Sequence, residues 1–246
     1  MSSSRVILHL DLDAFFCAVE EIKDPGLRGK AFAVGGSPSG RGVVTSCSYP
    51  ARKMGVRSAM PTAKALQLCP NLILVSRNHH DYGRYSDLVM EQLGRVSDQV
   101  EQISIDEAFL DITDLGPSPK AIGIQLQQTI LQELNLPNSV GIASNKLVAK
   151  IATGVGKMAA GGDGPPNAIT IVPPGEERSF LAPLPVDMLW GVGPKTKERL
   201  ERYNIYTIGD LASYPEVELA EKFGKHGYDL SRRSKGIDNS GIITER

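Results

Sequence analysis

The sequence predicts a fold of the mixed α+β class. Stretches with the apolar spacing of helices alternate with short apolar stretches typical of strands along most of the 246 residues. A hydrophobic content of 41% is sufficient for well-formed cores in one large domain or in two to three smaller ones. No run of about 18 apolar residues is present, so we expect no membrane-spanning helix. The N-terminal residues "MSSSRVILHLD" lack the cleavable apolar segment of a secretory signal, so we expect no such signal.

The cysteines and the net charge limit the class of protein only loosely. Cys17, Cys47 and Cys69 are odd in number and lack metal-ligand spacing, so we expect reduced thiols in a cytoplasmic protein. A formal net charge of -1 is mildly against a strongly electrostatic nucleic-acid binder. Carboxylates that bind cations would nevertheless lower this count without making a DNA-facing surface acidic.

The first expected element is a strand over residues 6–11, whose apolar composition indicates burial on both faces. The strand ends in Asp11 and Asp13, and helical spacing follows from about Asp13 through Phe16. Buried carboxylates are costly unless a cation meets them. Two interpretations are open at this point: Asp13 simply begins the helix, or one of the two aspartates holds a metal ion.

The following segment, about residues 23–78, is rich in Gly, Pro and Ser and predicts a small subdomain inserted into the rest of the fold. Further along the chain, the expected elements are a helix at 79–96, strand-like residues 99–112, a helix at 121–135, a strand at 139–144 and a flexible loop at 157–168. Short helices with Gly-rich joints are expected from there to about residue 236, and the remaining residues have the composition of a linker.

A second carboxylate pair, Asp106 and Glu107, lies within "ISIDEAFLDI". Apolar residues fall on odd positions before this pair and on even positions after it, so we expect a turn or bulge here. An isolated acidic pair is most simply an exposed hairpin tip. If the hairpin lies beside the strand that ends at Asp11, however, three carboxylates converge and repel one another unless cations are bound. Mg²⁺ suits such ligands, and two ions about 3.5–4 Å apart are typical of nucleotidyl transfer.

Five segments occur in the order and at the separations found in Y-family DNA polymerases, and the sequence resembles that family, most closely its DNA polymerase IV branch. They are "DLDAFFCAVEE", "SYPARKMGV", "SIDEAFLD", "VGIASNKLVAKIAT" and "LWGVGPKTKERL". The resemblance implies a right-hand polymerase core with a mixed β-sheet palm flanked by helices, small fingers and a helical thumb with a helix-hairpin-helix. The implied boundaries are 1–14 and 79–168 for the palm, 15–78 for the fingers, 169–236 for the thumb and 237–246 for the start of a linker.

The resemblance also implies the catalytic centre. Asp11, Asp106 and Glu107 would be the catalytic carboxylates that bind two Mg²⁺ ions, for which Mn²⁺ is expected to substitute. The backbone carbonyl of Leu12 would add one metal ligand. Asp13 is then expected to cap the following helix rather than to serve as a principal ligand.

A dNTP site is implied by the same resemblance. Phe16 matches the sugar-discriminating position, where an aromatic ring leaves a 2′-hydroxyl neither room nor a hydrogen-bond partner, while Phe15 packs inward. The other implied nucleotide contacts are Ser46, Tyr49, Arg52, Ala59 and Lys157. Tyr49 and Arg52 would share one face of a short helix, and arginine and lysine suit phosphate oxygens. Taken alone, each of these charges would be interpreted as a solvated surface residue.

The segment "LWGVGPKTKERL" resembles a helix-hairpin-helix. Gly191 and Gly193 would permit the tight turn, whose backbone N–H groups can meet a DNA phosphate. Lys195 and Lys197 would add attraction to DNA that is independent of its sequence. A Gly-x-Gly alone would equally fit a plain turn between helices.

Taken together, the resemblance implies an error-prone, translesion, template-directed DNA polymerase of low processivity. The expected partners are primer-template DNA and a dNTP, and we expect a cytoplasmic monomer. The chain stops where the family continues into a little-finger domain, so binding to the sliding clamp is expected only of a full-length protein. Primer extension by the shorter chain is expected to be distributive and sensitive to salt.

Two other interpretations remain. A nucleotidyl cyclase-like palm enzyme would need neither the inserted subdomain nor the helix-hairpin-helix. A non-catalytic DNA-binding scaffold would not need to retain three carboxylates together with Phe16 and Arg52. One feature departs from the family pattern: the loop 158–166 is longer than the compact Lys-Pro-Asn-Gly version, and nothing in the sequence explains its additional glycines.

Overall fold

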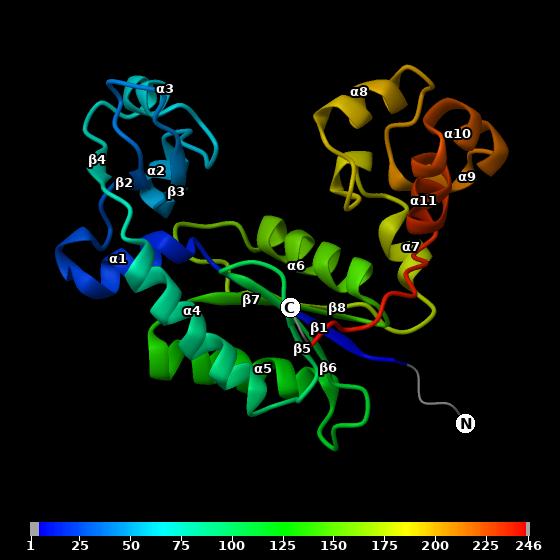
Figure 1. The fold of residues 1–246 in the computed structure, drawn as a ribbon, viewed down its shortest axis with the longest axis horizontal. Helices are drawn as coiled ribbons and strands as arrows, with labels where there is room; N and C mark the ends of the chain where they lie inside the picture. The colour runs from blue at the N-terminus through cyan, green and yellow to red at the C-terminus, as the bar shows by residue number, and fades with distance from the viewer. Residues whose placement is uncertain (1–4, 245–246) are drawn as a thin grey trace.

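The structure, a computed structural model, describes residues 5–244 and confirms the predicted α+β class. Within these residues the chain forms a five-stranded and a three-stranded sheet. Figure 1 shows two lobes that rise from opposite ends of the larger sheet, on the side covered by helix α6 (Lys146–Ala160). We call the larger sheet with its helices the palm, the lobe with the small sheet the fingers, and the C-terminal helical lobe the thumb.

The palm sheet has its N-terminal strand at the centre. Its strands, in the order β5-β6-β1-β7-β8, are β5 (Val100–Gln102), β6 (Glu107–Asp111), β1 (Ile7–Leu12), β7 (Asn138–Ala143) and β8 (Ile169–Ile171). β1 is antiparallel to both of its neighbours, and β8 is parallel to β7. Because β8 pairs with β7, the sheet continues past residue 168. The strand β8 thus lies in the larger sheet, just after residue 168, where the palm is predicted to end.

The two faces of this sheet differ. Helices α4 (His79–Gly94) and α5 (Pro119–Leu134) cover one face, and α6 covers the other (Figure 1). Leu8, Leu10 and Leu12 join the apolar core under α4 and α5, whereas the alternate residues of β1 point toward α6. The sheet is therefore buried on both faces, as the composition of its first strand predicted.

Close packing of α6 on β7 depends on a glycine. A Cβ atom added at Gly141 would lie 2.1 Å from the carbonyl oxygen of Ala149 and 2.6 Å from the amide nitrogen of Thr153. Any side chain at this position would therefore move the helix away from the sheet. The missing side chain places the face of α6 directly over the ends of the central strands.

The fingers form around a small core of their own. Their elements are β2 (Phe32–Gly35), β3 (Val44–Cys47), β4 (Ile73–Val75), α2 (Tyr49–Lys53) and α3 (Thr62–Leu68). Helix α2 begins after Ser48, whose hydroxyl accepts a hydrogen bond from the amide of Ala51. Helix α1 (Phe15–Lys23) and the 3-10 turn η1 (Pro25–Leu27) precede them, and Phe15 belongs to the palm core although the fingers were predicted to begin there.

The thumb consists of short helical elements on a core continuous with α6. They are α7 (Glu177–Leu181), the 3-10 turn η2 (Val186–Met188), α8 (Pro194–Glu201), α9 (Ile208–Ser213), α10 (Glu216–Phe223) and α11 (Lys225–Ser234). Residues 237–244 follow without a helix or strand, yet the amide of Ile243 donates to Glu101 Oε2 at 2.9 Å. This part of the predicted linker therefore lies against the palm. Residues 245–246 of that linker and 1–4 of the predicted palm lie outside the described residues.

The cysteines and the length of the helices bear on the expected absence of disulfides and of membrane-spanning helices. Cys17, Cys47 and Cys69 are all buried there as free thiols. Among residues 5–244, no helix has the length and apolar character of a membrane span.

Candidate active site

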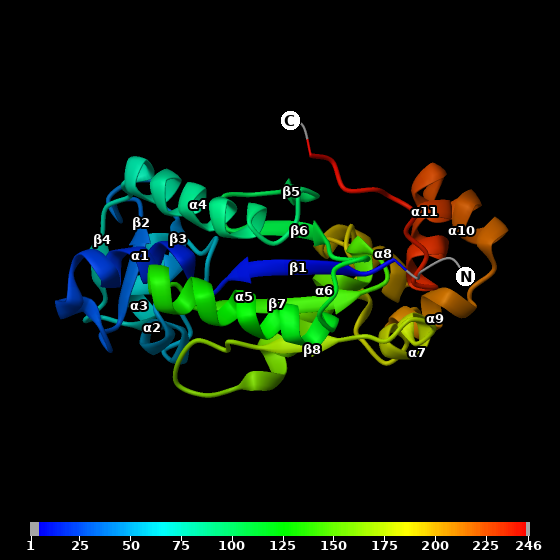
Figure 2. The ribbon, with the colours of Figure 1, turned by 90° about the horizontal axis from the view of Figure 1, so that it is seen from below.

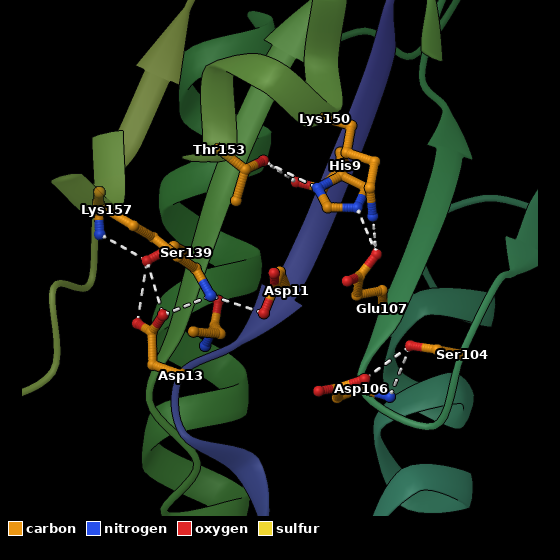
Figure 3. Close-up of polar contacts among 12 residues, drawn as sticks. His9, Asp11, Asp13, Ser104, Asp106, Glu107, Ser139, Lys150, Thr153 and Lys157 are labelled. Carbon is orange, nitrogen blue, oxygen red and sulfur yellow. Dashed lines mark hydrogen bonds and ion pairs between the residues drawn. The ribbon is translucent and has the colours of Figure 1, made fainter. Parts of the chain in front are cut away.

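The register of the palm sheet brings the predicted catalytic carboxylates to one end of two adjacent strands. Asp11 in β1 lies directly opposite Glu107 in β6, and opposite residues of an antiparallel pair share one face. Asp106 comes immediately before β6, and its carbonyl oxygen accepts a hydrogen bond of 2.9 Å from the amide of Leu12. The predicted turn between β5 and β6 is therefore present, and Asp11, Asp106 and Glu107 lie at the same end of the sheet (Figure 3).

Helix α6 presents a row of polar side chains to this face of the sheet. Lys146, Lys150, Thr153 and Lys157 follow the four-three-four spacing of a single helix face. Lys157 Nζ lies 2.6 Å from Asp11 Oδ1, and Lys150 forms an ion pair with Glu107 (Figure 3). The helix thus supplies positive charge that offsets the desolvation penalty of the carboxylates at this end of the sheet.

The two facing carboxylates, Asp11 and Glu107, differ in their pKa values. Burial raises the pKa of Asp11 to about 6, although the ammonium of Lys157 opposes that shift. Burial would also raise the pKa of Glu107, but the hydrogen bond with His9 and the ion pair with Lys150 outweigh it and lower the pKa to about 2. At neutral pH both groups are ionised, and Asp11 is the one that protonates first on acidification.

His9 orients Glu107 through a hydrogen bond. Its ring is 1% exposed, its Nδ1 lies 2.9 Å from Thr153 Oγ1, and its Nε2 lies 3.4 Å from Glu107 Oε2 (Figure 3). Burial lowers the pKa of His9 to about 4, so the ring is neutral at pH 7. We assign the tautomer in which Nε2–H donates to the carboxylate, because Nδ1 can then accept the hydroxyl proton of Thr153.

The prediction that Asp13 caps the following helix is wrong. The N-cap residue of α1 is Ala14, in the left-handed conformation at φ 50°. This turn directs the buried carboxylate of Asp13 into the palm, where it accepts hydrogen bonds of 2.9 and 3.0 Å from the hydroxyl of Ser139. Lys157 Nζ lies 2.8 Å from the same carboxylate, so this lysine joins Asp11 to Asp13.

A pocket of about 290 Å³ opens beside Asp11, between the palm and the fingers. The residues that were predicted for the site and line this pocket are Asp11, Leu12, Phe15, Phe16, Ser46, Tyr49, Arg52, Asp106 and Lys157. These side chains come from β1, α1, β3, α2, α6 and the turn before β6, which are far apart in the sequence. The structure therefore gathers most of the predicted nucleotide contacts with two of the three carboxylates.

Aromatic and cationic groups in this pocket support one another. The guanidinium of Arg52 lies 5.0 Å from the ring centroid of Tyr49, and Arg52 Nε donates to the carbonyl of Cys47 at 3.1 Å. Burial and the nearby charge of Asp13 raise the pKa of Tyr49, so its hydroxyl is a proton donor at neutral pH. The half-buried ring of Phe16 rests against the ring of Tyr82, with centroids 4.4 Å apart.

Other predicted residues lie outside this pocket. Ala59 is exposed in the fingers, on a turn with φ 63°, and is not part of the lining. The four predicted DNA contacts form a separate group in the thumb: Gly191, Gly193, Lys195 and Lys197. Gly191 has φ 102°, a conformation that favours glycine, and Gly193 is the N-cap residue of α8.

Sequence reasoning missed four residues that support the site: His9, Ser139, Lys150 and Thr153. Two signals could have found most of them. In β1, polar residues alternate with leucines, which predicts that His9 shares a face with Asp11. In α6, Lys150 and Thr153 share the helix face of Lys157, which had already been predicted to reach the site.

The donors present fit a divalent metal ion. Asp11, Asp106 and Glu107 offer the hard oxygen ligands that Mg²⁺ prefers, next to the backbone of Leu12. Within residues 5–244, no group of three His, Cys, Asp or Glu side chains is close enough to form a ready metal site. The ammonium groups of Lys157 and Lys150 supply the positive charge beside two of these carboxylates.

Comparisons with known proteins agree with this geometry. The impB/mucB/samB family matches residues 10–154, and the helix-hairpin-helix motif of the same family (IMS family HHH motif) matches residues 174–205. DNA polymerase IV of Listeria monocytogenes serotype 4b is 43% identical over the whole chain, which covers 68% of the Listeria protein. DNA polymerase IV of Francisella philomiragia is 42% identical over 98% of the chain and is also covered to 68%.

Solved structures give the same result. The crystal structure of DinB from Sulfolobus solfataricus superimposes with a TM-score of 0.86 at 31% identity, over 97% of this chain and 69% of that one. An insertion ternary complex of Dbh DNA polymerase gives a TM-score of 0.86 at 32% identity, over 96% of this chain and 69% of that one. The predicted resemblance is therefore confirmed, and the chain belongs to the impB/mucB/samB family of Y-family DNA polymerases, in its DNA polymerase IV branch.

Proposed function

We propose that this chain, a translesion DNA polymerase by its family, transfers a deoxynucleotide from a dNTP to the 3′-hydroxyl of a primer and releases pyrophosphate. The observation that carries the proposal is one pocket that combines Asp11 and Asp106 with the phosphate-binding side chains Arg52 and Lys157. Carboxylates alone would suit many metal sites. Carboxylates next to a lysine, an arginine and a tyrosine suit a metal-bound triphosphate.

In this proposal Asp11, Asp106, Glu107 and the carbonyl of Leu12 hold two Mg²⁺ ions, with Mn²⁺ as a substitute. Such ions lower the pKa of a primer hydroxyl and neutralise charge on the departing pyrophosphate. The protein side chains orient these groups. His9 and Thr153 fix the carboxylate of Glu107, and Lys157 is the group released from Asp11 toward the phosphates.

The remaining pocket residues are assigned to the nucleotide. Ser46, Tyr49 and Arg52 face the triphosphate from the fingers. The ring of Phe16, held by Tyr82, lies beneath the sugar, and Phe15 packs inward behind it. Ala59 would lie near the nascent base pair, where a small side chain leaves room for a distorted template.

DNA contacts are assigned to the thumb. The hairpin at Gly191 and Gly193 would present backbone N–H groups to a phosphate of the primer-template duplex, and Lys195 and Lys197 would add electrostatic attraction. We further propose a cytoplasmic monomer that releases DNA readily, and we assign clamp binding to regions that the family carries beyond the part matched here. The chain spans 68% of the Listeria relative.

A labelled primer-template with Mg²⁺ and dNTPs tests the proposal against its two alternatives. Template-directed extension supports it. Formation of cyclic nucleotide from ATP or GTP without DNA would support a nucleotidyl cyclase-like enzyme instead. A mobility shift of the DNA without any extension would support a non-catalytic scaffold. Low processivity predicts that products shorten as salt rises, and long products at high salt would contradict that part of the proposal.

Substitution of Phe16 tests the orientation of the nucleotide in the pocket. Phe16→Ala is expected to raise ribonucleotide incorporation relative to deoxynucleotide incorporation by about tenfold or more, because the ring no longer excludes the 2′-hydroxyl. The measurement is the ratio of kcat/KM for the two nucleotides with the same primer-template. An unchanged ratio in an active variant would place the sugar elsewhere.

A further inference from the structure

The glycine-rich loop that departs from the family pattern forms one wall of the pocket. Gly161, Gly162, Gly164 and Pro166 line the pocket together with the catalytic residues. The loop leaves α6 through Gly161 and Gly162, whose φ angles of 50° and 107° turn the chain back toward β8. Figure 2 shows this segment, in yellow-green, extending from the end of α6 to the side of the fingers before it returns to the sheet.

The far end of this loop is fixed to the palm by Asp13. The amide of Asn167 donates to Asp13 Oδ2 at 3.1 Å, and the amide of Ala168 donates to the hydroxyl of Ser139 at 3.1 Å. Ser139 in turn donates to the carboxylate of Asp13. Because this carboxylate is fully buried, its hydrogen bonds are stronger than those of an exposed group.

The middle of the loop is tied to the fingers. Lys53, at the end of α2, forms an ion pair with Asp163. Both side chains are largely exposed, so this pair adds little to global stability, but it joins two regions across the mouth of the pocket. Arg52, the residue before Lys53, lines the same pocket.

We propose that Asp13 is a positioning residue for the nucleotide, and that residues 161–167 are a wall of the triphosphate site held at Asp13 and at Lys53. This inference rests on the proposed nucleotide site. Glycines allow the backbone of the wall to approach a phosphate and to offer N–H donors, which gives a physical reason for their presence.

Asp13 also explains how Lys157 stays in place. The lysine is shared between Asp11 and Asp13, at 2.6 and 2.8 Å. If Asp11 held a metal ion, Asp13 would still keep the ammonium beside the pocket, where it could meet a phosphate. One buried carboxylate therefore sets the position of both a phosphate-binding side chain and the loop that faces it.

The first test uses Asp13→Asn, which keeps the size of the side chain and removes its charge. Loss of a charge-assisted contact predicts a KM for the dNTP raised by about tenfold, with kcat changed much less. Hydrogen exchange of residues 158–168 in the protein alone, without metal, DNA or nucleotide, is expected to become faster. Should Asp13→Asn fail to fold, Ser139→Ala removes one support of the same carboxylate and is measured in the same way.

The second test exchanges the charges of the ion pair between Lys53 and Asp163. Lys53→Glu and Asp163→Lys are each expected to raise the dNTP KM by about two- to fivefold, as an exposed pair allows. The double variant with both substitutions is expected to restore it. Lys64→Glu, the same charge change on α3 of the fingers, is the matched control. When it is combined with Asp163→Lys, the dNTP KM should stay raised, because Lys64 is not the partner of Asp163 in the ion pair.

The outcomes separate this inference from the function on which it rests. Unchanged exchange and unchanged KM in Asp13→Asn, or a double variant no better than the single ones, would overturn the inference while primer extension continues. Failure of the unmodified chain to extend a primer would instead overturn the proposed function. In that case the exchange experiment still tests the anchoring by Asp13.

Discussion

The two faces of the palm sheet are built on the same strands but with different chemistry. Toward α4 and α5, the strands present Leu8, Leu10 and Leu110, which pack into an apolar core. Toward α6, the same strands present charged groups such as Asp11 and Glu107. Apolar burial stabilises the first face directly, whereas each carboxylate of the second needs a cation to offset its desolvation. The face toward α4 and α5 contributes mainly to the stability of the fold, whereas the face toward α6 carries the carboxylates that we propose bind cations.

Along α6, the ion pairs on the charged face of the sheet differ in their exposure to solvent. At one end, Lys146 and Glu101 form an ion pair at 2.8 Å with side chains that are 6% and 5% exposed. At the other end, Lys157 and Asp11 pair at 2.6 Å with side chains that are each 24% exposed. The first pair is closed and structural, and the second opens onto the pocket. Access to solvent therefore separates pairs that hold the fold from pairs that can exchange a lysine for another cation.

The largest expected effect of a substitution is on the open end of the charged face. Asp106→Asn should lower the single-turnover rate of primer extension by about a thousandfold or more, because a ligand of the metal-bound transition state is lost. Unfolding free energy should change little, since the substitution keeps the backbone hydrogen bond with Leu12, and an amide oxygen can still accept from the hydroxyl of Ser104.

The matched control lies on the apolar face. Ile142→Val removes one buried methyl group there and should lower unfolding stability by about 0.5–1.5 kcal/mol while the extension rate stays near that of the unmodified chain. Equal losses of rate in both variants would mean that the two faces are not specialised as described.

Substitution in the buried ion pair of Lys146 and Glu101 is expected to lower the stability of the fold. Lys146→Met leaves Glu101 buried without its lysine, which should cost about 3–5 kcal/mol of unfolding free energy. Adding Glu101→Gln should recover much of that loss, because a neutral amide tolerates burial better. Chemical denaturation of both variants measures the effect. A Lys146→Met protein as stable as the unmodified chain would remove the distinction between closed and open pairs.

Much of this arrangement is predictable from the sequence, and the limits have physical causes. The change of apolar phase at Asp106 predicted the hairpin correctly because strand periodicity is a local property. The role of Asp13 was predicted wrongly because a helix cap is also a local pattern, whereas its real partners, Ser139 and Asn167, are more than 120 residues away. Contacts between distant segments depend on register and packing, which local patterns do not specify.

Boundaries were less predictable than contacts within an element. The resemblance implied a thumb that begins at residue 169, and residues 169–171 form a strand whose partner in the larger sheet is β7. The division of the chain into palm, fingers and thumb at the predicted residues, and the roles of the site residues, stay predictions that the experiments described here address.

The smallest expected effect concerns pH, in the protein without metal. The pKa of Asp11 is raised to about 6, so the folded state binds a proton more readily than the unfolded chain does, and this group adds stability as pH falls through 6. The pKa of Glu107 is lowered to about 2, so its contribution is lost only below its ordinary range. Asp11→Asn should therefore flatten the dependence of unfolding free energy on pH between about 4.5 and 6. Parallel curves for the two proteins would contradict this assignment.

The central claim is that Asp11, Asp106 and Glu107 hold divalent cations at the end of the palm sheet. Titration of Mn²⁺, followed by electron paramagnetic resonance, into the chain with a dNTP and a non-extendable primer-template tests it most directly. Two bound ions are predicted for the unmodified chain, and at least one should be lost in Asp106→Asn. The same stoichiometry and affinity in both proteins would contradict the account.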